Sequence, residues 1–454
     1  SGFSRGSHNG KALMNILETF PRDELFQISE DDLLDMGLGI VHLQDRQRVA
    51  LFIRRDDFER FTSCLVFVPR ERYTTDLRLR IQAILEEAFA GQVAAHYAQL
   101  GESPLARLHI VISCTPGEIP AYDVGQLEVR LAEETRSWAD HLQDALTAAH
   151  GVQIGLKLCQ RYQKAFPAAY RERFDAEAAL ADIDAVEWTL ASGELGMHLY
   201  REGGAVPNEV SFKIYHAGTS IPLSDVLPML EHMGLKVDDE ILYKITPEGA
   251  GAVMIHDFGL ETRSGAPVKL DGTREIFHGA FRRVWRGEME SDGFNGLVLG
   301  AGLAWREVVI VRAYCKYLLQ AGIAFSQAYM EQTLVSNPAL TRLIVRYFNC
   351  LFDPTLAKEG ARRAASARRS LIKGLDDVVS ADEDRILRRF INMVDCTLRT
   401  NFFQPGADAG PKPYVSFKLD SQNLEELPLP RPLREIFVYS PRVEGVHLRF
   451  GLVA

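Results

Sequence analysis

Hydrophobic residues follow two different periods along this chain of 454 residues. Between about residues 62 and 265, short runs alternate apolar and polar positions, which is typical of half-buried strands, and amphipathic helical runs separate them. From about residue 272 the apolar positions repeat at helical spacing, and the alternating pattern returns after residue 409. The pattern therefore predicts an α+β chain with two small mixed modules, then a helical region, then the start of another sheet.

The first mixed module is expected over residues 62–151. Its strands CLVFVP, VAAHYAQL and LARLHIVISC are separated by an amphipathic helix over 77–91 and a turn over 101–104. A long helix is predicted from Asp123 to Ala149. The order β-α-β-β-α indicates a ferredoxin-like split βαβ unit.

The second mixed module is expected over residues 190–265. The runs GELGMHLYRE, NEVSFKIYH, GLKVDDEILYKI and GAVMIHDFGLE predict four strands. A helix from Ser220 to Met233, with Pro222 in its first turn, lies between the second and third strands. The two modules thus share one arrangement.

Residues 1–61 have the pattern of the end of a preceding module. We expect a helix, a break at Pro21, a short strand, a helix capped by Ser29, and a strand in ALFIRRDDF. At the other end, Val446, Leu448 and further apolar residues alternate with polar ones up to Ala454, so a strand is expected to continue there.

Composition and charge narrow the classes of function. The net charge is −10, and binding to nucleic acid needs a basic surface, so nucleic acid is not expected as the main partner. The six cysteines form no CxxC pair, which indicates reduced thiols in a cytoplasmic protein. The N-terminus does not look like a secretory signal, and no apolar run is long enough to span a bilayer.

No motif in the chain predicts a catalytic, cofactor-binding or metal-binding residue. GLVLGAGLAW resembles a dinucleotide fingerprint, but Trp305 stands at the third glycine position, so a junction between helices is expected. His109 and His447 each lie within a predicted strand and are assigned structural roles. The acidic residues between Asp376 and Asp384 suit the start of a helix, and the arginines between Arg362 and Arg369 suit a salt-bridged surface.

One loop leaves two interpretations open. Gly218 lies between a predicted strand and the N-terminus of a predicted helix, where backbone N–H groups can bind a small carboxylate. A purely structural turn, in which glycine adopts a left-handed conformation, explains the same residues. The structural turn is the simpler of the two.

Several stretches resemble motifs of the large bacterial NAD-dependent glutamate dehydrogenases, both in their residues and in their order along the chain. They are FIRRDDFERFTSCLVFVPRERYTTDLRLRIQAIL, SPLARLHIVI, SFKIYHAGTSIPLSDVLPMLEHMGL, ADEDRILRRFINMVDCTLRTNFFQ and SPRVEGVHLRFGLVA.

The resemblance implies a domain order for the chain. It is the tail of an N-terminal module (1–61), an ACT-like module (62–151), a helical linker (152–189), a second ACT-like module (190–265), a helical region (266–408) and the beginning of a catalytic domain (409–454). The catalytic lysine and the NAD-binding domain would follow residue 454.

The resemblance also implies a function. The whole enzyme would oxidise L-glutamate with NAD in the cytoplasm, and this segment would provide regulation and homo-oligomerisation without activity of its own. ACT-like modules often bind amino acids, so an effector is expected at His216, Ala217, Gly218 and Thr219, between the second module and a second copy. The alternative is a stand-alone amino-acid-sensing protein built from ACT-like modules.

Overall fold

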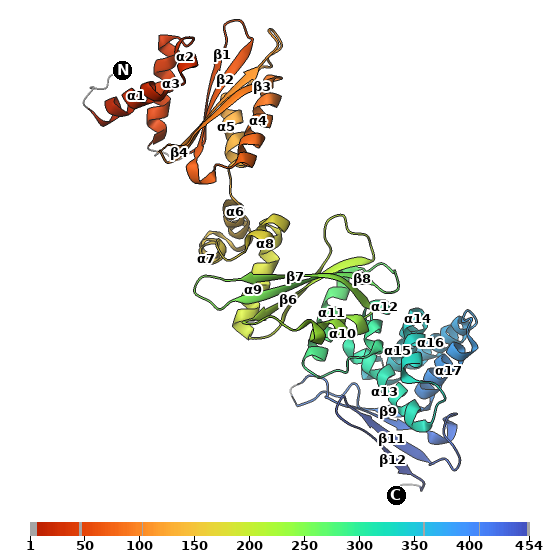
Figure 1. The fold of residues 1–454 in the computed structure, drawn as a ribbon. Coiled ribbons are helices and arrows are strands. Elements are labelled where there is room, and N and C mark those ends of the chain that lie inside the picture. Colours follow the sequence, from red (N-terminus) through yellow and green to blue (C-terminus); the bar gives the residue numbers. More distant parts are fainter. Residues whose placement is uncertain (1–6, 45–47, 102, 357–358, 408, 452–454) are drawn as a thin grey trace. The chain divides into compact units, whose positions relative to one another are not determined.

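The computed structural model describes residues 7–44, 48–101, 103–356, 359–407 and 409–451. The chain divides into two compact units, Ser1–Cys159 and Gln160–Ala454. Each unit contains a four-stranded antiparallel sheet with helices on both faces (Figure 1). No helix in these described ranges combines the length and the apolar character needed to cross a membrane.

The first unit has the sheet order β1-β2-β4-β3. Its elements are α1 (His8–Thr19), α2 (Arg22–Leu25), α3 (Glu30–Gln44), β1 (Ala50–Arg55), β2 (Phe61–Pro69), η1 (Arg70–Arg72), α4 (Thr75–Phe89), β3 (Gln92–Gln99), β4 (Leu105–Ser113), α5 (Val124–Glu134) and α6 (Trp138–His150). Helix α7 (Val152–Tyr162) spans the division between the units.

Strand β2 is buried on both faces, which explains its almost unbroken apolar sequence. Cys64, Val66 and Val68 pack in one core with residues of α4 and α5. Leu65 and Phe67, which point to the other face, pack in a second core with residues of α1 and α3. Figure 1 shows these two helical layers on opposite faces of the sheet.

Three expectations for this unit are wrong. The short strand expected after Pro21 is instead the helical turn α2, and Pro21 occupies its N-cap position. The strand in ALFIRRDDF does not belong to a preceding module, because β1 pairs with β2 along its whole length. The long helix Asp123–Ala149 is two helices, since Ser137 begins α6 with a capping box that Asp140 completes.

The second unit repeats the plan, with the order β5-β6-β8-β7. Its elements up to the helical region are α8 (Ala168–Arg173), α9 (Ala178–Ser192), β5 (Gly196–Tyr200), β6 (Glu209–Ala217), α10 (Leu223–His232), β7 (Leu235–Ile245) and β8 (Val253–Thr262). Helix α10 is shorter than the expected Ser220–Met233, because Pro222 is its N-cap residue in an extended conformation.

Helices and a last sheet complete the second unit. They are α11 (Leu270–Trp285), η2 (Gly293–Gly296), α12 (Leu297–Gly300), α13 (Trp305–Ala321), α14 (Gln327–Ser336), α15 (Pro338–Phe352), η3 (Pro354–Leu356), α16 (Gly360–Leu375), α17 (Ala381–Cys396), β9 (Thr397–Thr400), β10 (Val415–Leu419), η4 (Ser421–Asn423), β11 (Arg434–Tyr439) and β12 (Glu444–Arg449). The sheet order is β12-β11-β10-β9.

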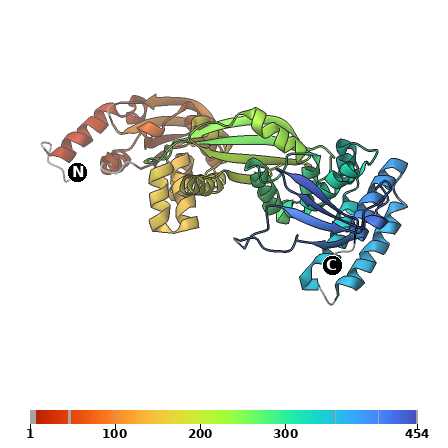
Figure 2. The same cartoon turned by 90° about the horizontal axis from the view of Figure 1, so that it is seen from below.

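Helix α13 lies at the centre of this region, as its apolar sequence predicts, with ten buried residues. Tyr314 on α13 forms a hydrogen bond of 2.8 Å with Thr397 and packs against Phe417 of β10. One continuous apolar core therefore joins the helices to the last sheet, which lies against them in Figure 2. Strand β12 ends at Arg449, so the expected strand does not include residues 450–451, and its continuation over 452–454 lies outside the described residues.

Candidate functional site

The four residues expected to bind an effector form the connection between β6 and α10. The His216 Nδ1 atom donates to the Thr219 carbonyl oxygen at 2.7 Å, which closes the loop on itself. Gly218 has a φ of +88°, and a Cβ atom placed there would meet nothing within 4 Å. Its N–H donates to the Ala252 carbonyl at 2.8 Å. The glycine thus permits the turn. Its N–H group, which we expected to be available to a small carboxylate, already forms a hydrogen bond within the protein.

A buried histidine on β8 stabilises this loop through a hydrogen bond. Nε2 of His256 on β8 accepts a hydrogen bond of 3.0 Å from the Ile221 N–H group. Its Nδ1 lies 2.9 Å from Glu240 Oε1 on β7. Because Nε2 accepts, the proton is on Nδ1, which donates to the carboxylate. No local pattern distinguishes His256 from any other polar residue in a strand, so sequence reasoning missed it.

The opposite face of the same sheet contains a buried ion pair that sequence reasoning missed. Lys213 on β6 is 2 % exposed, and its Nζ lies 2.7 Å from Asp182 Oδ2 on α9. Asp182 is fully buried and also accepts hydrogen bonds from the hydroxyl groups of Tyr170 and Tyr215. A buried charge is tolerated only when it is paired and hydrogen-bonded, and both conditions hold here.

Aromatic rings enclose the Lys213 ammonium group. Its Nζ lies 3.7 Å from the centre of the Phe174 ring and 5.0 Å from that of Tyr200. The Tyr200 hydroxyl donates to Asp257 at 2.9 Å. Burial raises the pKa of Asp257 to about 6, although Lys213 and the Tyr200 hydrogen bond act in the opposite direction. These groups bind one another and fix α8 and α9 to the sheet.

The first unit contains a comparable pair. Arg54 Nε on β1 donates to Glu24 Oε2 on α2 at 2.6 Å, and both side chains are buried. His109, for which we predicted a structural role, is buried beside Glu24 and forms a 2.9 Å hydrogen bond with Ser63. Burial would raise the pKa of Glu24, but the contact with His109, whose Nε2 lies 3.7 Å away, and the hydrogen bond from Arg54 lower it to about 2. In each unit, then, a buried ion pair joins a preceding helix to the sheet.

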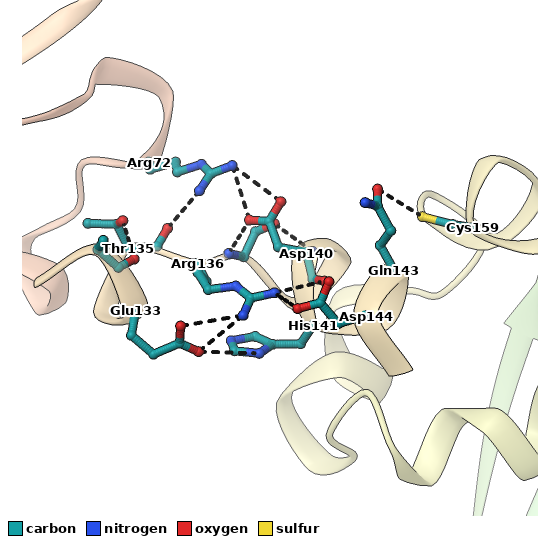
Figure 3. Close-up of polar contacts among 11 residues, drawn as sticks. Arg72, Glu133, Thr135, Arg136, Asp140, His141, Gln143, Asp144 and Cys159 are labelled. Carbon is teal, nitrogen blue, oxygen red and sulfur yellow. Dashed lines mark hydrogen bonds and ion pairs between the residues drawn. The ribbon is translucent and has the colours of Figure 1, made fainter. Parts of the chain in front are cut away.

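The break between α5 and α6 is held by a network of arginines and carboxylates (Figure 3). Arg72 donates to the Thr135 carbonyl at 3.2 Å and lies 3.0 Å from the Asp140 carboxylate. Arg136 contacts Glu133 on α5 and Asp144 on α6. The network therefore ties together the two helices on either side of the break.

The charged clusters of the helical region have structural partners. On α16, Arg363 pairs with Glu359 and Arg368 pairs with Asp395. Ser380 caps α17, whose first turn contains three acidic residues, as the sequence predicts.

Within the described ranges, the cysteines and histidines named in the sequence analysis form no metal site either. All six cysteines are buried and free. No group of metal-ligating side chains occurs among the residues that the structure describes. His447 lies on β12, paired in register with Ile436.

The glycines of GLVLGAGLAW do not form a dinucleotide site. Helix α12 ends at Gly300, and Gly302 adopts a φ of +64° in the turn before α13 begins at Trp305. A dinucleotide site of this type needs a strand before the glycines, whereas η2 and α12 precede them. These residues thus do not fit NAD and form the helix junction that the sequence predicts.

Six family models match the chain in succession and cover most of it. They are the glutamate dehydrogenase helical motif 1 (residues 1–46), ACT2 domain (50–139), helical motif 2 (145–188), ACT3 domain (194–273) and helical motif 3 (289–354), followed by the bacterial NAD-glutamate dehydrogenase catalytic domain (370–454). The two α+β modules are thus ACT domains, as expected. The catalytic-domain match begins at residue 370, earlier than our boundary at 409.

Curated relatives agree with these matches. The chain is 42 % identical to an NAD-specific glutamate dehydrogenase of Halomonas elongata over 455 residues, and 37 % identical to one of Pseudomonas aeruginosa over 457. It is 38 % identical to one of Mycobacterium tuberculosis over 468 residues. The alignments include 99–100 % of this chain but only 28 % of each relative. The ordered matches along the whole length show that the chain belongs to the family of large bacterial NAD-dependent glutamate dehydrogenases.

Proposed function

We propose that this chain is the regulatory and assembly portion of a cytoplasmic enzyme of amino-acid catabolism. That enzyme would convert L-glutamate, NAD and water to 2-oxoglutarate, ammonium and NADH, with its active site in residues outside the present chain. The order of the matches carries the proposal, because ACT domains and helical motifs fill residues 1–354 before the catalytic-domain match begins. The chain spans 28 % of the length of its relatives, which supports the same division.

A direct assay tests this proposal. The purified chain is mixed with L-glutamate and NAD, and NADH is followed by its absorbance. We expect no glutamate-dependent NADH from the chain. NADH formation that depends on glutamate and persists after repeated purification would overturn the proposal, because it would place an active site within these residues.

Self-association is the second part of the proposal. Strands β3 and β7 each lie at an edge of their sheet, and most residues of β3 are exposed. An exposed edge offers unpaired backbone groups to a strand of another chain. Light scattering should give a mass of two or more chains, and Ala94→Lys on β3 should reduce it. A single-chain mass at every concentration would contradict this part.

An amino-acid effector at the loop 216–219 remains the finer part of the proposal. The loop is exposed, and His216 Nε2 has no hydrogen-bond partner among the described residues. A thermal-shift screen with the twenty amino acids should find a stabilising ligand, since binding to the folded state raises the melting temperature. His216→Ala should abolish that shift, and the exposed His141→Ala should retain it. If no amino acid changes the melting temperature, this part is wrong.

A further inference from the structure

The second unit contains a large cavity that neither the expected active site nor the effector loop explains. It has a volume of about 910 Å³ and lies between α11, α13 and the ends of β10 and β11. Its walls are largely apolar, with Trp305 and Val309 from α13, Tyr414 and Val415 at the start of β10, and Val443 before β12. The size falls within the range of small-molecule sites, roughly 300–1,000 Å³.

The charges around the cavity contrast with the rest of the chain. The whole chain has a net charge of −10, yet the cavity is lined by the four cations Arg283, Arg312, Lys412 and Arg442 and by one carboxylate, Glu288. Arg283 pairs with Glu288. Lys412 donates to the Gln404 amide oxygen at 3.0 Å. Within the described ranges, neither Lys412 nor Arg442 forms an ion pair with a carboxylate, so the cavity has an excess of positive charge.

A buried arginine with an unused donor lies in the same wall. Arg312 is fully buried, and its Nε and Nη2 atoms each donate to Asp292 at 2.7 Å. Its Nη1 atom has no hydrogen-bond partner among the residues that the structure describes. Leaving a buried donor unsatisfied costs about 1–3 kcal/mol, so such a group in a cavity wall points to an acceptor supplied from elsewhere.

One of these cations also stacks on an aromatic ring of the wall. The Arg283 guanidinium lies 4.4 Å from the centre of the Trp305 ring. The Tyr439 side chain, which is 2 % exposed, also lines the cavity. The cavity thus combines apolar surface for an organic body with cations for a negatively charged group.

We propose that this cavity binds a small organic anion with an apolar body. Lys412 and Arg442 bind the oxyanion, the apolar body packs against Trp305 and Val309, and Arg312 supplies a buried donor. The cavity walls come from the helical region and from strands within the catalytic-domain match, so the ligand would hold these two regions together. The inference does not depend on the proposed function, because it rests on the cavity and its charges alone.

Two dyes of similar shape test the proposal. The purified chain is titrated with 1-anilinonaphthalene-8-sulfonate, which is an anion, and with neutral N-phenyl-1-naphthylamine, and fluorescence reports binding. The combined change Lys412→Gln and Arg442→Gln should weaken binding of the sulfonate about tenfold, or about 1.4 kcal/mol, and leave the neutral dye unaffected. Val443→Trp at the rim should weaken binding of both dyes by obstructing the cavity.

A matched control separates local charge from total charge. Arg362→Gln and Arg369→Gln remove two exposed cations of α16, which does not line the cavity. This control should bind both dyes as the unmodified chain does. Displacement of the sulfonate by benzoate would identify a carboxylate site, and displacement by phenyl phosphate a phosphate site. The proposal is overturned if neither compound displaces the dye, if the control weakens binding equally, or if Val443→Trp changes nothing.

Discussion

Replacing Lys213 with methionine tests whether the buried ion pair fixes the helices α8 and α9 to the second ACT domain. Methionine fills a similar volume but removes the ammonium group that lies 2.7 Å from Asp182. The carboxylate would then remain fully buried, with only the hydroxyl groups of Tyr170 and Tyr215 as donors. Leaving one partner of a buried pair uncompensated costs about 3–5 kcal/mol, which is the loss of unfolding free energy that we expect.

A second variant separates the lost charge from the lost contacts. Asp182→Asn combined with Lys213→Met removes both charges, while the asparagine oxygen can still accept from one tyrosine and its NH2 group can donate to the hydroxyl oxygen of the other. The double variant should therefore be more stable than Lys213→Met alone, by about 1–3 kcal/mol, because it leaves no unpaired buried charge.

The assay is urea unfolding at neutral pH, combined with hydrogen exchange of the α9 amides. Exchange over Ala178–Ser192 reports the helix itself, which matters because a chain with two units need not unfold in a single step. Lys236→Met is the matched control, since Lys236 is exposed and pairs with Asp238 at 2.7 Å. We expect Lys236→Met to cause no measurable change in the free energy of unfolding or in the exchange of the α9 amides. The reasoning is refuted if Lys213→Met and Lys236→Met change stability alike, or if the double variant is less stable than Lys213→Met.

Four other changes have defined outcomes. Burial raises the pKa of Asp257 to about 6, from about 3.9 in the unfolded chain. The contribution of this group to the free energy of unfolding therefore falls by about 3 kcal/mol as the pH rises from about 4 to 8. Asp257→Asn should remove that loss, which urea titrations at the two pH values measure. Burial opposes ionisation of Glu24, but hydrogen bonds lower its pKa to about 2. The stabilisation of the fold by the ionised carboxylate is therefore lost as the pH falls from about 4.5 to 2. Melting curves of Glu24→Gln should lack this acid-dependent loss. Arg136→Ala should accelerate hydrogen exchange between α5 and α6, with a change in unfolding free energy below about 1 kcal/mol. Gly218→Ala should cost about 1–2 kcal/mol in thermal unfolding, because alanine is strained at a φ of +88°.

The order of elements could be predicted because local patterns determine much of it. Alternation over VSFKIYH and similar runs identifies strands, and the burial of α13 follows from its apolar sequence. The break between α5 and α6 was missed because Thr135-Arg136-Ser137 contains neither proline nor glycine. There the side-chain bonds of Ser137 and Asp140 cap the start of α6, while α5 ends at its C-cap residue Thr135.

The buried polar groups could not be predicted for a different reason. In VSFKIYH, Ser211, Lys213 and Tyr215 alternate with Phe212 and Ile214, which is the pattern of a strand with one face in water. The structure instead covers the polar face with α8 and α9, so its charge needs a partner. That covering depends on α8 and α9, which lie well before β6 in the chain (Lys213 and Asp182 are 31 positions apart), and no local period reveals it.

A hybrid enzyme tests most directly the claim that this chain is the control and assembly portion of a glutamate dehydrogenase. In the Halomonas elongata relative, the aligned segment, 28 % of that protein, is replaced by this chain. The measurement is the initial rate of NADH formation from L-glutamate and NAD, compared with the unmodified relative. We expect the hybrid to assemble and to produce NADH. A soluble, folded hybrid that produces none would contradict the account, because the chain would then fail to replace the segment that it matches.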